Sequence, residues 1–558
     1  MTIQWNDWPV ESTDTLVSDE LNPADDRLAV LPALAQAQEA QAEEAQAEFP
    51  VLVPIIPIMA PLLIAGPEEL SVEAMLDIVD GHPLKLQHSL LDQLRATRDA
   101  ALLALESDEP VYGVNTGVGA FSEVRVNYSD RAGFQNALML AHSVGSAPWL
   151  EKKEARAVIV VRLRNFLSGE AAVSPELCER LVDILNLDLY PAIPRKRSGS
   201  AGEIIPLAHL GAAITRSGEF IVDDLILPAD KVLSSVGLDC FDLGTKEGVA
   251  MIEGIPVTTA LAILNVRDTR VIADQALTIA AAGLRLIGAS RDPYSAATAR
   301  ADTELVTVLG ALRGLLGRET PSRSLQAPLS FRIIGVVLAQ LLRTVQGVED
   351  AIGRALGGVT DSPVFIEGRF VGTVGFDGFD LAASFDALRV SLIHLAETSN
   401  ARLHRMMNGQ ITGLAQQLSE EPGLHTGFTI VHKRSVGVIH ELLARAMPVS
   451  VGAIETSLGQ EDVQSFSVGA AVSSAEAIES VRDVLSCELL VVIQGVRLGA
   501  GSLVSDDKLA PLLHEISDAL PSGTADRPFG KEIATINSLL ADGWARGLLS
   551  KTLETSHA

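Results

Sequence analysis

The stretch that decides the fold is Pro194-Arg-Lys-Arg-Ser-Gly-Ser-Ala-Gly-Glu-Ile-Ile-Pro-Leu-Ala-His209. Three small residues, Ser200, Ala201 and Gly202, stand between a basic strip and the sequence Pro-Leu-Ala-His. Small side chains let the backbone turn tightly and approach a cavity closely. By itself this pattern predicts no more than a tight loop that leads into a helix.

A second glycine-rich run lies upstream and reads Tyr112-Gly-Val-Asn-Thr-Gly-Val-Gly119. It does not follow the dinucleotide-binding pattern, because no GxGxxG opens a helix within a βαβ unit. Its glycines instead allow the backbone to carry Tyr112 into a cavity.

Together the two runs resemble the aromatic and histidine ammonia-lyase family, which also contains aminomutases. The family's loop reads Gly-Ser-x-Gly-Ala-Ser-Gly-Asp-x-x-Pro-Leu-Ala-His, and its Ala-Ser-Gly condenses into the electrophilic ring 4-methylideneimidazol-5-one. Aligned without a gap on Pro206-Leu-Ala-His209, this chain has Ser200-Ala201-Gly202 at the three ring positions.

This replacement changes the chemistry that the loop can perform. The exocyclic alkene of the ring appears when the middle serine loses its hydroxyl as water, and Ala201 has no hydroxyl. A shifted register, Gly199-Ser200-Ala201, restores a middle serine, but the attacking nitrogen would then belong to Ala201, whose Cβ crowds its approach. We therefore expect a degenerate prosthetic loop at Ser200, Ala201 and Gly202, and no cofactor.

Composition limits the class of protein. The 558 residues are 47% hydrophobic but only 4% aromatic, and the net charge is −28. A core of Ala, Leu, Val and Ile suits closely packed helices, and the acidic balance argues against binding to a phosphate backbone. The chain opens without the basic and apolar order of a secretory signal, so we expect a cytoplasmic protein with no nucleic acid or membrane partner.

Organisation along the chain follows from charge and periodicity. We expect residues 1–61 to be an acidic, disordered or extended arm, with prolines interrupting its apolar end. Residues 62–245 would form the active-site region, with the Tyr112 loop and the 198–209 loop, and 246–558 a central long-helix bundle with C-terminal helices. Long apolar stripes predict helices over 256–290, 330–356, 381–407 and 460–498.

These helices indicate a mainly α protein, and they resemble the long-helix bundle of the ammonia-lyases (fumarase/aspartase-like). That family assembles as tetramers, so the resemblance implies a homotetramer whose active sites draw on more than one subunit. It covers roughly residues 62–547.

The resemblance also implies a site. Tyr112 matches the family's catalytic base, and Arg332, in Gln326-Ala-Pro-Leu-Ser-Phe-Arg332, matches the arginine that holds the substrate carboxylate. Leu329 replaces the family's second tyrosine, and Glu461, in Gln-Glu-Asp-Val-Gln-Ser, matches a glutamate near the substrate amine. A helix-pairing arginine is the structural alternative for Arg332.

Three further residues complete the expected site. Glu253 stands where the family has an asparagine beside the ring, and if it shares a cavity with Glu461, one of the two carboxyls could stay protonated. Phe370 matches a pocket phenylalanine, and His142 matches the histidine of the substrate-selecting helix, with an ordinary helix histidine as the alternative. We expect His209 to hold the loop by a hydrogen bond, and no metal, because the histidines lack ligand spacing.

Three functions stay open from the sequence. The first is a repurposed enzyme of specialised metabolism without the ring, which performs elimination or its reverse, conjugate addition or cyclisation, on an activated carboxylate- or carbonyl-bearing small molecule. The second is a conventional histidine or aromatic ammonia-lyase or 2,3-aminomutase with an atypical prosthetic group. The third is a non-catalytic homologue that binds a small molecule.

Overall fold

The computed structural model describes residues 59–107, 109–317, 321–452, 454–499 and 508–549. The expectations for the acidic arm fall largely on residues 1–58, which lie outside this set. Helices dominate the described chain, and strands occur there only as three two-stranded pairs. The prediction of a mainly α fold is confirmed.

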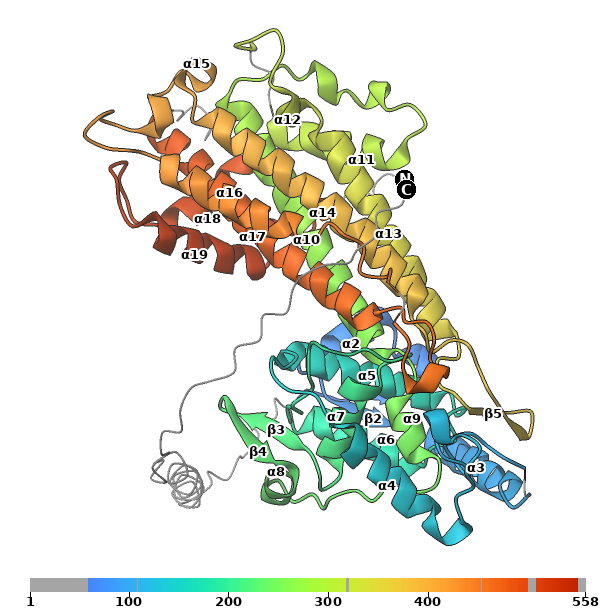
Figure 1. Ribbon diagram of the computed structural model, residues 1–558. Helices are drawn as coiled ribbons and strands as arrows, with labels where there is room; N and C mark the ends of the chain where they lie inside the picture. The colour runs from blue at the N-terminus through green and yellow to red at the C-terminus, as the bar shows by residue number, and fades with distance from the viewer. Residues whose placement is uncertain (1–58, 108, 318–320, 453, 500–507, 550–558) are drawn as a thin grey trace, which may run out of the picture. The chain divides into compact units, whose positions relative to one another are not determined.

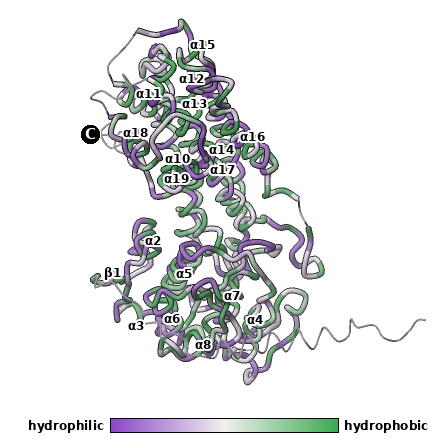
Figure 2. Tube along the Cα trace, turned by 90° about the vertical axis from the view of Figure 1, so that its left-hand side faces the viewer, coloured by the Kyte–Doolittle hydropathy of each residue, from purple (hydrophilic) through white to green (hydrophobic). Residues whose placement is uncertain are grey.

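Four long helices form the central bundle (Figure 1). They are α10 (Pro256–Leu286), α13 (Ile334–Gly357), α14 (Phe379–Met406) and α17 (Ser467–Arg497). Helix α17 packs on both α10 and α14, and α13 packs on the same two helices. The tube coloured by hydropathy shows apolar residues recurring along them (Figure 2), and alanines such as those of α10 let the helix axes approach closely.

The stretch 247–286 is apolar and long enough to cross a membrane by length and composition alone. Its most apolar window is 94% buried inside the protein. Neighbouring helices therefore cover its apolar faces, as they would for a core helix.

The starts of two helices show how far local sequence determines where a helix begins. Helix α2 is Val72–Val79, and the side chain of Ser71 before it accepts a hydrogen bond from the backbone N–H of Ala74 at 3.2 Å. The helix expected from residue 460 begins only at Ser467, so that prediction was wrong at its start. Glu461 instead forms a β-bridge with Thr456, and left-handed Phe466 precedes the helix.

The rest of the chain surrounds the two ends of the bundle. The helices at the end that holds the loops of interest are α3 (His88–Ala104), α4 (Arg131–His142), α5 (Lys152–Leu167), α6 (Pro175–Asn186), α7 (Ile204–Ile214), α8 (Ala229–Ser235) and α9 (Glu247–Ile252). Those placed elsewhere are α11 (Thr303–Leu316), α12 (Leu329–Arg332), α15 (Gly409–Thr412), α16 (Thr429–Leu443), α18 (Leu509–Asp518) and α19 (Phe529–Ala541).

The strand pairs are short. Strand β1 (Leu62–Ile64) pairs in parallel with β2 (Leu84–Leu86). The other two pairs are antiparallel hairpins, β3 (Glu219–Val222) with β4 (Leu225–Pro228) and β5 (Val364–Ile366) with β6 (Arg369–Val371). None of these two-stranded pairs is large enough to form a central sheet, so the core is built by helices that pack against one another.

One end of the bundle gathers several of the segments singled out from the sequence. Helices α4, α7 and α9 pack against one another there, and α5 packs on α10 (Figure 1). Two short 3₁₀ turns, Gly119–Phe121 and Ser457–Gly459, are also in contact. The Tyr112 loop therefore meets the chain that leads into α17.

Candidate active site

The Tyr112 loop is held by its own polar groups. The buried side chain of Asn115 accepts a hydrogen bond from the Val111 N–H at 2.7 Å, which closes the turn around Tyr112. The Tyr112 hydroxyl accepts a hydrogen bond from the Gly119 N–H at 2.8 Å. Tyr112 is 37% exposed, so the loop does not enclose it completely.

Burial raises the pKa of Tyr112 above its ordinary value. The hydrogen bond from Gly119 opposes this shift, and the carboxyl groups of Glu253 and Glu461 add to it. A phenol with a raised pKa carries its proton at neutral pH. Tyr112 therefore rests as an acid or hydrogen-bond donor, and it takes a proton only after it has given one.

Glu461 joins its own turn to the 198–209 loop. Its carboxylate accepts hydrogen bonds from the Ala201 N–H at 2.7 Å, the Ser457 hydroxyl at 2.9 Å and the Thr456 hydroxyl at 3.1 Å. Ser457 also lies beside the Tyr112 loop, because a Cβ placed on Gly119 would be 3.6 Å from its side chain. Tyr112, the 198–209 loop and Glu461 thus belong to one site.

The degenerate triad keeps a tight turn. Gly202 has a φ of +79°, which is the left-handed region that glycine adopts without strain. An added Cβ there would lie 3.6 Å from the Gly254 carbonyl oxygen, so this loop runs alongside the residue after Glu253.

The residues present do not fit the family's prosthetic ring. The middle residue, Ala201, cannot lose a hydroxyl, and its N–H, which the shifted ring would need as the attacking group, is engaged by Glu461. The hydroxyl of Ser200 donates to the Gly202 carbonyl at 3.3 Å.

Glu203 fixes the loop to the bundle. Its side chain is fully buried and accepts hydrogen bonds from the backbone N–H groups of Val257 and Thr258 in the first turn of α10. Burial raises the pKa of Glu203 to about 7, although these donors oppose the shift. A carboxylate is favoured at a helix N-terminus, where unpaired N–H groups point outward.

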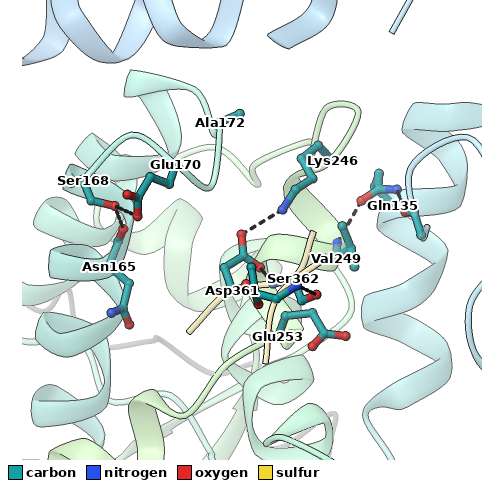
Figure 3. Close-up of polar contacts among 12 residues, drawn as sticks. Gln135, Asn165, Ser168, Glu170, Ala172, Lys246, Val249, Glu253, Asp361 and Ser362 are labelled. Atoms are coloured by element: carbon teal, nitrogen blue, oxygen red, sulfur yellow. Dashed lines mark hydrogen bonds and ion pairs between the residues drawn. The ribbon is translucent and has the colours of Figure 1, made fainter. Parts of the chain in front are cut away.

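Glu253 ends α9 and lies among other charged groups. Figure 3 shows the Lys246 ammonium reaching Asp361, at 2.9 Å, with Glu253 beside Asp361. Burial raises the pKa of Glu253 to about 8. Asp361 and Glu461 add to that rise, whereas Lys246 and Arg162 oppose it, so the surroundings of Glu253 favour its protonated carboxyl.

Two of the proposed substrate-binding residues have local partners. His142 lies at the end of α4, and its Nδ1 is 2.8 Å from the carbonyl oxygen of Leu138 on the same helix. Phe370 is half-buried in the β5–β6 hairpin, where its ring packs against that of Phe365 at 5.3 Å. The Gly145 N–H donates to Nε2 of His209 at 3.0 Å, as expected for a residue that holds the loop.

The other three proposed substrate-binding residues do not lie at this site within one chain. Gln326, Leu329 and Arg332 lie on and beside α12, at the end of the bundle away from α4 and α9 (Figure 1). Leu329 is 60% exposed, and Arg332 is half-buried and donates through Nε to the Ala327 carbonyl at 3.0 Å.

Four charged residues of the site were not predicted from the sequence. They are Arg162, Glu203, Lys246 and Asp361. The signal that could have found Arg162 is its place directly after the apolar run 157–161, in a helix that buries most of its length. The others stand in loops or at helix starts, where one sequence gives no sign of burial.

Residues that could bind a metal ion are not clustered in the described ranges. Within them no cluster of three or more His, Cys, Asp or Glu residues is arranged to hold a metal ion. Cys178 and Cys487 are buried free thiols, and Cys240 is a half-buried one.

Comparisons with known proteins give the same fold and name a family. A family model described as aromatic amino acid lyase matches residues 70–520. A histidine ammonia-lyase of Geobacillus thermodenitrificans (strain NG80-2) is 30% identical over 493 residues, which cover 86% of this chain and 97% of that protein.

Solved structures agree with this result. The tyrosine aminomutase of Streptomyces globisporus superposes with a TM-score of 0.82 at 24% identity, over 88% of this chain and 99% of that one. The histidine ammonia-lyase of Trypanosoma cruzi gives a TM-score of 0.80 at 22% identity, over 88% and 96% of the two chains. The chain therefore belongs to the aromatic amino acid lyase family.

Proposed function

We propose that this protein is an acid/base enzyme of the aromatic amino acid lyase fold that works without the methylideneimidazolone ring. The observation that carries the proposal is Ala201 at the middle of the triad, with its N–H bound to Glu461. Ammonia elimination from an ordinary amino acid needs the electrophilic ring, because the amine is a poor leaving group. A substrate that is already activated by a carbonyl or thioester needs only orientation and proton transfer.

The protonation of the site favours addition over elimination. Tyr112 and Glu253 both hold a proton at neutral pH, so they can supply two hydrogen bonds or protons to a conjugated carbonyl compound. We assign Glu253 to the carbonyl oxygen, where negative charge develops, and Tyr112 to the carbon that gains or loses a proton. Glu461 accepts hydrogen bonds and orients both loops.

The chemical class of substrate follows from these donors. It is a small molecule with an alkene or a β-proton next to a carbonyl, and intramolecular addition would make the reaction a cyclisation. We place it in specialised metabolism and in the cytoplasm, as the sequence suggests. No prosthetic group takes part in these steps.

A complete site would need residues from a neighbouring subunit. Arg332 is the group suited to a substrate carboxylate, and it lies with Gln326 and Leu329 on and beside α12, at the end of the bundle away from α4 and α9. A homotetramer with shared sites would bring them together. Mixing a Tyr112→Phe protein with an Arg332→Gln protein should restore part of the turnover if the sites are shared, and should restore none if each chain works alone.

A conventional lyase is the second candidate, because a close relative is named histidine ammonia-lyase. The mass of the intact protein and of the peptide from Ser198 to Pro206 decides between the two. Loss of two waters would mean that a ring with its alkene had formed, and histidine and aromatic amino acids would then be tested first. An unmodified peptide excludes that chemistry.

The activity itself is tested with a panel of α,β-unsaturated acids and thioesters, with histidine, tyrosine and phenylalanine beside them. Turnover of an activated compound that is lost in Tyr112→Phe and Glu253→Gln supports the proposal. A protein that binds panel compounds but turns over none of them, with Tyr112→Phe binding equally well, would be a non-catalytic homologue.

A further inference from the structure

A cavity of about 330 Å³ lies beside the basic strip that precedes the degenerate loop. Three segments form its wall: the strip 195–198, the chain after α16 with Arg445 and Val449, and the start of α17 from Phe466 to Glu476. This volume is at the lower end of the range that small-molecule sites in proteins have. The cavity is therefore large enough for part of a ligand, such as one charged group and the atoms next to it.

The cations of this wall outnumber its carboxylates. Among the described residues Glu476 is the one carboxylate that lines the cavity, and it pairs with both Lys196 and Arg445. Arg197 donates through Nη1 to the Ser146 hydroxyl at 3.2 Å, and no carboxylate of the described residues lies within ion-pair distance of it. Three cations against one carboxylate leave two positive charges without a partner.

Other charged groups stand behind the wall. Arg195 also lines the cavity, but its guanidinium faces Glu154 at 3.3 Å and Glu151 at 3.9 Å. Glu479 lies near enough to Glu154 to act on it electrostatically. When Arg195 and these three acids are included, four cations face four carboxylates. The positive surplus is therefore confined to the cavity and does not extend over the surface around it.

The wall also has strained backbone and unused donors. Arg197 has a φ of +69° and Phe466 a φ of +49°, both in the left-handed region. This conformation is unfavourable for a residue with a side chain, and it is concentrated at sites that bind ligands. The hydroxyls of Ser198 and Ser473 line the cavity too, and within the described residues neither has a hydrogen-bond partner. Both can donate to a bound anion.

The cavity is connected to the candidate active site along two segments. Ser198 precedes Ala201 by three residues, so at most about 11 Å of chain separate them. Phe466 follows Glu461 by five residues, which span at most about 18 Å. Because Glu461 binds the Ala201 N–H, both segments lead to one place. A ligand anchored in the cavity can reach that place with an extended arm.

We propose that this cavity holds the phosphate of a coenzyme thioester, whose pantetheine arm carries the activated acyl group from Arg197 to Tyr112. A phosphate monoester has a charge of about −1.5 to −2 at neutral pH, which matches the two unpaired positive charges. A carboxylate would balance only one of them. The net charge of −28 disfavours a long polyanion, but a single phosphate enclosed by cations does not meet the rest of the surface.

This inference rests on the proposed function. It narrows the substrate from activated carbonyl compounds in general to thioesters that carry a phosphate.

The test compares two probes that differ by one phosphate, crotonyl-phosphopantetheine and crotonyl-pantetheine, by isothermal titration calorimetry on the full-length protein. The wild type should bind the phosphate-bearing probe about 10- to 100-fold more tightly, as expected for hydrogen bonds to a charged group. Arg197→Gln should reduce this preference by about 10-fold. Arg197→Lys keeps the charge without the planar guanidinium, so it should lose less of the preference.

Arg216→Gln is the matched control. Arg216 is exposed and does not line this cavity, so its loss removes the same charge from the protein and should leave the phosphate preference unchanged. Equal binding of the two probes by the wild type would overturn the inference, as would a folded Arg197→Gln protein with the wild-type preference. If that variant does not fold, an unchanged preference in Arg445→Gln, which removes a cation of the same wall from another segment, does the same.

Turnover separates this inference from the proposed function. If both probes are converted with equal kcat/KM, the acid/base activity stands and the phosphate site is wrong. If the phosphate-bearing probe binds through Arg197 but neither it nor any other activated compound is converted, the phosphate site stands and the proposed activity is wrong.

Discussion

Glu253→Gln should change how the stability of the protein depends on pH. In the folded chain the pKa of Glu253 is raised by burial to about 8, whereas an unfolded glutamate titrates near its ordinary value of 4.5. As the pH rises above 4.5 the unfolded chain loses this proton and the folded chain keeps it, so folding becomes less favourable. The penalty is absent below the unfolded value and complete above the folded one.

The size of the effect follows from the same two values. From about pH 5 to about pH 8 each pH unit costs the wild type about 1.4 kcal/mol, so the penalty reaches on the order of 4 kcal/mol. Glutamine has nearly the same shape but carries no titrating proton. The variant should therefore gain stability relative to the wild type as the pH rises, by that amount.

The assay is urea unfolding at fixed protein concentration, followed by far-ultraviolet circular dichroism at about pH 5 and about pH 9. The exposed Glu106→Gln is a matched control and should track the wild type at both values. If Glu253→Gln and the wild type show parallel pH dependence, Glu253 does not hold a proton in the folded state and the reasoning fails.

Three other substitutions have defined outcomes. Glu203→Ala should lower the free energy of unfolding by about 2 kcal/mol or more in urea unfolding, because two N–H groups of α10 lose their acceptor; equal stability would contradict the capping role. Arg402→Met should lower the free energy of unfolding by about 3 to 5 kcal/mol, because it leaves the buried Glu488 without its partner. Adding Glu488→Leu should recover much of this stability in thermal melts. A double variant as unstable as the single one would argue against this reasoning. Tyr112→Phe should reduce turnover by about 100-fold or more while the melting temperature stays nearly unchanged, and a variant of wild-type rate would remove Tyr112 from the chemistry.

The helices could be predicted because their signal is local. Apolar stripes predicted α10, α13, α14 and most of α17. The start of α17 could not be found this way, because Phe466 and the Thr456–Glu461 bridge interrupt a stretch whose composition still suits a helix.

The site was predictable only in part. The motifs led to Tyr112, Glu461 and the triad. Glu461 accepts a hydrogen bond from Ala201 of the triad, and Gly119 of the Tyr112 loop lies beside Ser457, which donates to Glu461. Lys246 and Asp361 are 115 positions apart in the sequence, so no local pattern predicts that they form a pair. Arg332 was expected at the site as well, but in one chain it lies at the other end of the bundle.

Glu203 has a consequence for how this enzyme could change over time. The same side chain ends the degenerate loop and caps α10, which with α17 is one of the two longest helices of the described chain, so the path of the loop is part of the architecture. The side chains at Ser200 and Ala201 contribute little to that architecture. A reactive group can therefore be lost from this loop without loss of the fold, which leaves a loop held beside Glu461 on which a different chemistry can be built.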